Sequence, residues 1–159
     1  MTKWINIDII VTKEFAGPML LATTDKFSNF TNKEEEFGFI NQITSELGYG
    51  SEKIPEENFF HVDLLEHDRN RACSFLAKYI FDEKSTDLRT KKYGRIIIIA
   101  ICYYKYVKEK ILTNLESLKK IILNFLENNE NLFKLPHINE FDKYDGILLD
   151  LEKNLLVSL

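Results

Sequence analysis

Imidazole and carboxylate groups are densest over one short run, which contains His61, Asp63, Glu66, His67 and Asp68. These residue types bind divalent metals and transfer protons, so His61, Asp63, Glu66 and His67 form a candidate metal or acid–base site. Apolar residues alternate with His61 and Asp63 over residues 60–64, which predicts a strand with both polar side chains on one face. The competing interpretation, which we favour, is that they form the solvent face of a half-buried strand and that Asp68 caps a following helix.

Acidic residues are concentrated between residues 32 and 68, where ten acids and two bases give a net charge of −8, against −4 for the whole chain. A surface of this charge attracts a basic partner and orients it during docking. The acids that we predict to bind a partner are Glu34, Glu35, Glu36, Glu46, Glu52, Glu56 and Glu57. Aromatic anchors are available beside them at Phe37, Tyr49, Phe59 and Phe60. The alternative is a solvated surface, with the first three glutamates stabilising the first turn of a helix.

A shorter basic run surrounds Tyr93 and consists of Arg89, Lys91, Lys92 and Arg95. Lysine and arginine beside an aromatic ring suit single-stranded nucleic acid. The sequence pI of about 5.5 argues against a dedicated nucleic-acid protein, and Arg95 directly precedes an apolar run. We therefore expect no nucleic-acid partner.

The sequence contains no nucleophile-elbow, phosphate-loop, dinucleotide-binding or zinc-protease motif and no CxxC pair. Cys73 and Cys102 lie in apolar surroundings, as buried small hydrophobic residues do. The longest apolar run, residues 96–104, is far shorter than the roughly 20 residues that cross a bilayer, and the chain does not start with a signal peptide. These observations predict a cytoplasmic protein that is not an enzyme, has no cofactor or metal and does not contact membranes.

The apolar pattern predicts one α/β domain over residues 1–159, with a single mixed sheet of about five or six strands and three main helices packed on it. We expect strands at residues 5–11, 19–24, 60–64 and 95–104, and a C-terminal hairpin made of 146–151 and 155–159. Expected helices run from Thr31 or Asn32 to Leu47, from about Asp68 to Ile80, and over 107–128. Because residues 95–104 are apolar on both faces, they are the predicted centre of the sheet.

The last predicted helix has apolar residues at steps of four, three, four and three, namely Ile111, Leu115, Leu118, Ile122 and Phe125. This seam is typical of a helix packed on a core and also of a coiled-coil dimer. We favour core packing and expect a monomer or a weak dimer, with a homodimeric structural protein as the alternative.

No motif identifies a family, but the overall profile of a small, acidic α/β chain without a catalytic motif resembles that of bacterial immunity proteins. The resemblance implies a cytoplasmic inhibitor that binds and neutralises one cognate toxin, often a nuclease, of a contact-dependent or polymorphic toxin system. Under this hypothesis the acidic surface of residues 32–68 covers the basic active-site face of the toxin. The alternative function is a small metal-dependent or acid–base enzyme that uses His61, Asp63, Glu66 and His67.

Overall fold

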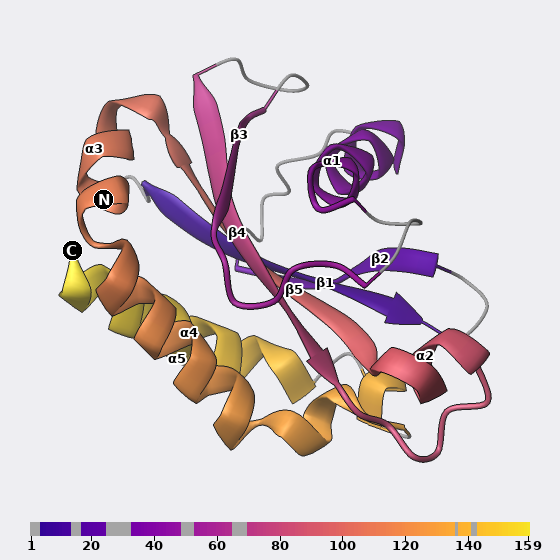
Figure 1. Cartoon of the computed structure of the whole chain (residues 1–159). Coiled ribbons are helices and arrows are strands. Elements are labelled where there is room, and N and C mark those ends of the chain that lie inside the picture. The colour runs from indigo at the N-terminus through magenta and orange to yellow at the C-terminus, as the bar shows by residue number, and fades with distance from the viewer. Residues whose placement is uncertain are drawn as a thin grey trace.

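Five antiparallel strands form one sheet in the order β2-β1-β5-β4-β3, and helices cover both of its faces (Figure 1). The computed structural model describes residues 4–13, 17–24, 33–48, 53–64, 70–135, 137–140 and 143–159. The strands are β1 (Ile5–Lys13), β2 (Gly17–Thr23), β3 (Phe60–Asp63), β4 (Arg71–Ile80) and β5 (Arg95–Tyr104). The helices are α1 (Lys33–Glu46), α2 (Leu88–Tyr93), α3 (Lys108–Thr113), α4 (Leu115–Asn128) and α5 (Tyr144–Ser158), with short 3-10 turns at Lys105–Val107, Glu130–Phe133 and His137–Asn139. The predicted α/β class and single sheet are confirmed, although every pairing of neighbouring strands is antiparallel.

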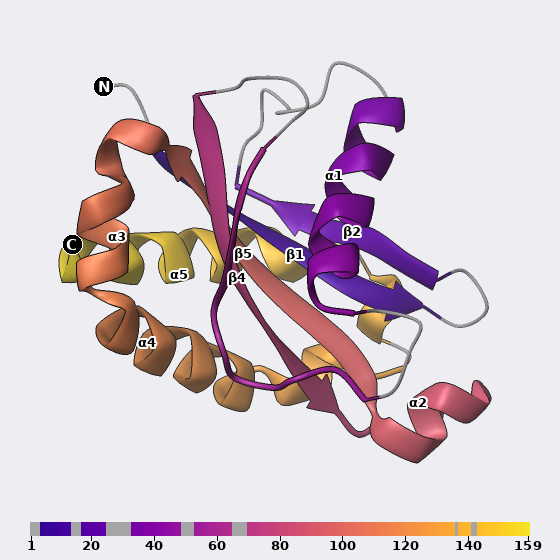
Figure 2. The same cartoon turned by 45° about the horizontal axis from the view of Figure 1, so that its top comes forward.

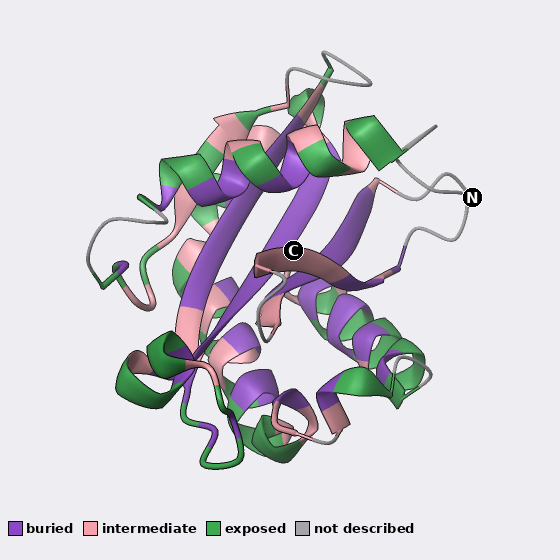
Figure 3. Cartoon of the chain, turned by 90° about the vertical axis from the view of Figure 1, so that its right-hand side faces the viewer, coloured by how far each residue is buried: buried purple, intermediate pink, exposed green. Residues whose placement is uncertain are grey.

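The central position of β5 is also confirmed, because it pairs with β1 on one side and β4 on the other. Alternate residues of β5 enter two separate apolar cores. Ile97, Ile99 and Ile101 pack with α3, α4 and α5, whereas Ile96, Ile98 and Ala100 pack with α1. The strands are buried along most of their length, and the helices expose their outer turns (Figure 3).

Helix α1 lies on one face of the sheet beside β2 and β3, and α4 and α5 run side by side across the opposite face (Figures 1 and 2). The buried residues of α1 are Phe39, Ile40, Ile43 and Thr44, and the chain turns at Gly48 with φ +77°. The predicted helix end at Leu47 is therefore confirmed to within one residue, whereas its predicted start at Thr31 or Asn32 lies outside the described residues. None of the helices in the described part of the chain combines the length and the apolar character needed to cross a bilayer.

The prediction of a helix from Asp68 to Ile80 is wrong, because Arg71–Ile80 is strand β4. The spacing of Ala72, Phe75, Leu76, Tyr79 and Ile80 matches a helix only because β4 lies inside the sheet. Residues 72–77 are all buried, with both faces of the strand covered, so apolar residues need not alternate along it. A central strand of this kind is not distinguished from a buried helix by periodicity.

The predicted C-terminal hairpin is also wrong, because Tyr144–Ser158 is one helix, α5. Its buried residues Tyr144, Leu148, Leu151 and Leu155 repeat at steps of four, three and four, which places them on one side of a helix. The polar triplet at 152–154 lies within the helix instead of forming a turn. The helix predicted over 107–128 is divided at Asn114 into α3 and α4, and Leu88–Tyr93 forms α2 within what we expected to be a polar connection.

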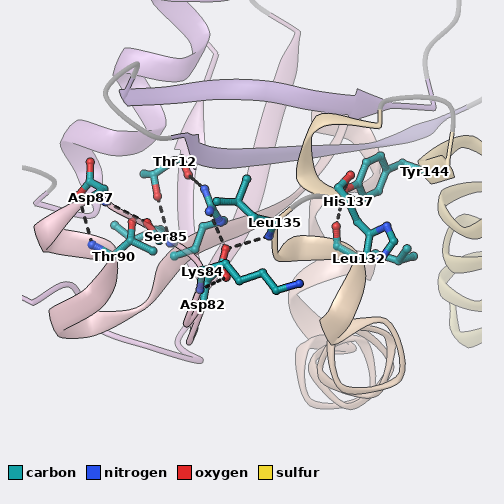
Figure 4. Close-up of polar contacts among 12 residues, drawn as sticks. Thr12, Asp82, Lys84, Ser85, Asp87, Thr90, Leu132, Leu135, His137 and Tyr144 are labelled. Carbon is teal, nitrogen blue, oxygen red and sulfur yellow. Dashed lines mark hydrogen bonds and ion pairs between the residues drawn. The ribbon is translucent and has the colours of Figure 1, made fainter.

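A buried ion pair joins the ends of three strands where β1 ends and β5 begins. Arg95 donates from Nη2 to Oδ2 of Asp82 at 2.8 Å and from Nη1 to the carbonyl oxygen of Thr12 at 2.7 Å. The carboxylate of Asp82 also accepts from the backbone N–H groups of Leu135, at 2.9 Å, and Lys84, at 3.1 Å (Figure 4). Burial alone would raise the pKa of Asp82, but these hydrogen bonds and the arginine charge lower it below the ordinary value of 3.8.

Candidate functional site

His61 and Asp63 lie on the same face of β3 and are both exposed, while Phe60 and Val62 are half-buried against the α1 core. The alternation predicted from the sequence is therefore confirmed. The carboxylate of Asp63 lies 3.6 Å from Nζ of Lys105 and 3.9 Å from Nζ of Lys108. Two lysines thus compensate the charge of Asp63, and its backbone carbonyl accepts from Nε2 of Gln42 at 2.6 Å.

The imidazole of His61 begins a chain of hydrogen bonds that leads into the core. Its Nδ1 lies 2.6 Å from Oγ of Ser74, and this oxygen lies 2.7 Å from the hydroxyl of Tyr103. Burial, together with the charge of Lys108, lowers the pKa of His61 below 6.5, while burial raises the pKa of Tyr103 despite its bond to Ser74. The neutral imidazole is therefore the favoured form in the folded protein.

A histidine beside a serine hydroxyl is the pairing that activates a nucleophile, but here the serine is closed to substrate. Ser74 and Tyr103 each have an exposed fraction of 0%. Within the described ranges, no three histidine, cysteine, aspartate or glutamate side chains converge on a point where a metal ion could bind. Glu66, His67 and Asp68 lie outside the described residues, so the second half of the predicted site has no position here.

The acids of α1 are divided between its exposed and half-buried sides. Glu34 and Glu46 are exposed, whereas Glu35 and Glu36 are partly buried. The exposed residues of α1, which together we call the acidic helix face, are Lys33, Glu34, Phe37, Asn41, Ser45 and Glu46. Phe37 has an exposed fraction of 64%, which is high for a large aromatic side chain. The sequence-based anchor at Phe37 is thus accessible to a partner.

The other predicted anchors do not form part of an exposed aromatic surface. Phe60 stacks on Phe75 with the ring centroids 5.9 Å apart, and Phe59 is half-buried against the core beneath α4 and α5. Tyr49 lies outside the described residues. Of the four proposed aromatic anchors, Phe37 is the exposed one in the described part of the chain.

The carboxylates of Glu56 and Glu57 both contact residues of β4. An oxygen of Glu56 accepts from the backbone N–H of Tyr79 at 3.1 Å, and Glu57 binds Nζ of Lys78 at 2.9 Å. The backbone N–H of Glu57 donates to the carbonyl of Ala77 at 2.9 Å, and its φ of +63° is rare for a residue with a side chain. These two glutamates therefore attach residues 53–59 to the free edge of β4 beyond β3. Glu52 lies outside the described residues.

Part of the basic run lines a cavity that was not predicted from the sequence. Arg95 is buried in its ion pair with Asp82 and so does not belong to a basic surface patch. Arg89, Lys91 and Lys92 are exposed on α2. A cavity of about 270 Å³, which we call the α2 cavity, lies between α2 and the sheet and is lined in part by Thr12, Lys13, Tyr79, Arg89, Thr90 and Tyr93. The available sequence signal was the basic run around Tyr93, but Lys13 and Tyr79 come from strands distant in sequence.

Comparison with known proteins identifies no family. No protein-family model matches the chain, and no curated protein matches it. Among solved structures, the longin domain of K. lactis Lst4 is similar with a TM-score of 0.42 and 15% sequence identity, and the alignment covers 96% of this chain and 98% of that one.

Proposed function

We propose that this protein is a non-catalytic binding module that neutralises a basic protein toxin by covering its active-site face with the acidic helix face. The observation that carries the proposal is Phe37, which is 64% exposed on the outer side of α1, one turn from the exposed Glu34. Exposed aromatic residues of this kind act as anchors at the centre of protein interfaces. The surrounding carboxylates add attraction over long distances to a basic surface.

Two further features support a binding role for α1. The buried residues of α1 are Phe39, Ile40, Ile43 and Thr44, so substitutions at its exposed positions should leave the core packing unchanged. The described residues of α1 carry four acids and one base, Lys33, which gives the helix a net charge of −3. In this complex Glu34 and Glu46 attract the basic partner, and Phe37 enters an apolar pocket on its surface. The bound protein then keeps phosphate or RNA out of the active site of the toxin by steric blocking and charge repulsion.

The test is to measure binding between the purified protein and the product of a toxin gene that neighbours its own gene. We expect Phe37→Ala to speed dissociation by about tenfold or more, because truncation of a central anchor costs ~2 kcal/mol. The double variant Glu34→Lys/Glu46→Lys should slow association at low salt by about tenfold or more and flatten its salt dependence.

Matched controls exist on other surfaces. Tyr106→Ala removes an aromatic ring that is 77% exposed outside α1, and Glu116→Lys/Glu127→Lys reverses two exposed acids of α4. Both controls should leave binding and the protection of toxin-exposed cells unchanged. Loss of protection in the controls but not in the α1 variants would place the interface elsewhere, and absence of any binding would refute the toxin as partner.

A further inference from the structure

A groove of about 360 Å³ runs between α4 and α5, the two helices that lie side by side on the face of the sheet opposite to α1 (Figure 1). Its lining comes from one stripe of each helix, at positions 121, 124, 125, 128 and 129 of α4 and 147, 150, 151 and 154 of α5. Steps of three and four place residues on one side of a helix, so the two stripes face each other. Both stripes lie in stretches that the structure describes without a gap, 115–135 and 143–159.

The floor of this interhelical groove is apolar. Phe125 and Leu151 are buried, with exposed fractions of 8% and 2%, and Ile121 and Ile147 are half-buried beside them. All of these side chains belong to the core beneath α4 and α5 or pack against it, so the floor is formed before a ligand arrives. A preformed apolar floor of this kind favours a ligand that brings apolar groups to it.

The rims of the groove carry pairs of exposed polar side chains, each pair one helical turn apart. Asn124 and Asn128 form the rim on α4, and Asp150 and Asn154 form the rim on α5. Within the described residues, none of these side chains takes part in a hydrogen bond or an ion pair. A carboxamide both donates and accepts hydrogen bonds, and a carboxylate accepts them. The rims therefore suit a ligand that presents N–H and C=O groups on two opposite sides.

The spacing along each rim matches that of an extended peptide. Asn124 and Asn128 are four residues apart on a helix, which is a rise of about 6 Å, and the same holds for Asp150 and Asn154. In an extended chain the N–H and C=O groups that face one side recur at every second residue, about 6.6–6.8 Å apart. A peptide lying along the groove would direct its main-chain groups alternately to the two rims and every second side chain to the floor.

A helical ligand fits this groove less well than an extended one. The N–H and C=O groups of an α-helix bond to one another along the helix, so they would leave the rim carboxamides without partners. The lining of α4 extends over eight residues, or about 12 Å, which accommodates about three to four extended residues at ~3.3 Å each. Main-chain hydrogen bonds combined with pockets for alternate side chains are a general mode of peptide recognition.

We propose that the interhelical groove binds a short extended peptide segment of a partner protein, with apolar side chains at every second residue and main-chain amides paired with Asn124, Asn128 and Asn154. Binding here is independent of the partner proposed for α1, since α1 lies on the opposite face of the sheet (Figure 1). The probe is the peptide acetyl-Leu-Thr-Leu-Thr-Leu-amide, titrated into the full chain. Binding is followed by NMR of the backbone amides and of the side-chain NH₂ groups of asparagine.

We expect saturable binding, with the largest shifts at the side-chain NH₂ groups of Asn124, Asn128 and Asn154. The same peptide N-methylated at its three central amide nitrogens keeps its side chains but loses N–H donors, so it should bind about tenfold more weakly or worse. The double variant Asn124→Ala/Asn128→Ala should weaken the unmethylated peptide by about tenfold, and Asn154→Ala, on the other rim, by about threefold. These variants should keep the melting temperature, because alanine favours helix more than asparagine does.

The matched control is Asn41→Ala, which removes the same kind of side chain from an exposed position of α1. Its affinity should stay within about twofold of the parent. An equal loss in Asn41→Ala and in the double variant would refute the groove as the site, as would shifts centred on other elements or absence of saturation. Equal affinity for the N-methylated peptide would refute pairing with the main chain. Saturable binding of maltose without binding of the peptide would also overturn the proposal, because sugar hydroxyls would then be the partners of the carboxamides.

Discussion

Asp82 and Arg95 form an ion pair from which water is excluded, with exposed fractions of 1% and 0% and 2.8 Å between Oδ2 and Nη2. The pair connects the second residue after β4 to the first residue of β5, and through Thr12 it also holds the end of β1. The ion pair therefore lies directly behind the α2 cavity, whose wall includes Thr12.

Removing the carboxylate of this pair should destabilise the fold strongly. Asp82→Ala leaves the guanidinium of Arg95 buried without its counter-charge, and we expect a loss of about 3–5 kcal/mol in the free energy of unfolding. The measurement is urea denaturation followed by circular dichroism. Glu130→Ala is the control, since Glu130 is half-exposed and lies 3.5 Å from Lys134, and its loss should cost less than ~1 kcal/mol. Similar losses in the two variants would contradict a structural role for the buried pair.

The imidazole of His61 should make stability depend on pH near neutrality. Because burial and then Lys108 lower its pKa, the folded protein takes up this proton less readily than the unfolded chain. The contribution of the neutral His61 ring to the free energy of unfolding is thus fully present above pH 6.5. It is lost as the pH falls through the lower pKa of the folded protein. An NMR titration of the His61 ring should give a midpoint below 6.5, and Lys108→Ala should move it upward. A midpoint at or above 6.5 in the parent would show that the contact with Ser74 stabilises the charged ring instead.

Glu56 should contribute to stability through one hydrogen bond. Glu56→Ala deprives the backbone N–H of Tyr79 of its acceptor, and we expect a loss of about 0.5–1.5 kcal/mol. Glu56→Gln removes the charge but keeps a carbonyl oxygen at the same position, so it should melt close to the parent. If the two variants lose the same stability, the negative charge and not the hydrogen bond is what matters at this position.

The core of the sheet should not tolerate charge. Ile98 of β5 is 1% exposed among the residues that pack beneath α1, so Ile98→Asp should abolish folding or soluble expression, given a typical domain stability of ~5–15 kcal/mol. Val157→Asp, at a position of α5 that is 89% exposed, should change the melting temperature little. A well-folded Ile98→Asp protein would contradict the central position of β5.

The sequence predicted β1 and β5 although both strands are buried on both faces, and it failed at β4 and α5. In β1 isoleucines alternate with the polar Asn6 and Asp8, and α1 buries residues at helical spacing, so both elements could be recognised from their periodicity. Strand β4 is enclosed by β3, β5 and both layers of helices, and its apolar residues imitate a helical period. In α5 the buried residues do repeat as in a helix, but the acidic and basic triplet at 152–154 suggested a turn.

The candidate sites show a similar limit. The shared face of His61 and Asp63 follows from alternation along one strand, so it could be predicted from local sequence. The contact between His61 and Ser74 depends on the register of β3 with β4, which the sequence does not state. The α2 cavity depends on the positions of β1, β4 and α2 relative to one another, which local sequence does not give. Arg95 was assigned to the surface because its pairing with Asp82, 13 residues earlier, also depends on how the chain folds.

The order of the strands also has a consequence for how the chain is made on the ribosome. Strand β1 is synthesised well before β5, yet its inner edge pairs with β5, as in Ile9 with Ile99, and its apolar face is covered by α5. The β1–β2 hairpin therefore emerges from the exit tunnel long before its neighbours exist. Until residues 144–158 have also emerged, Ile7 and Ile9 lack their final cover, so the sheet is completed only once α5 is available. The nascent hairpin is in the meantime a natural substrate for chaperones that hold apolar strands.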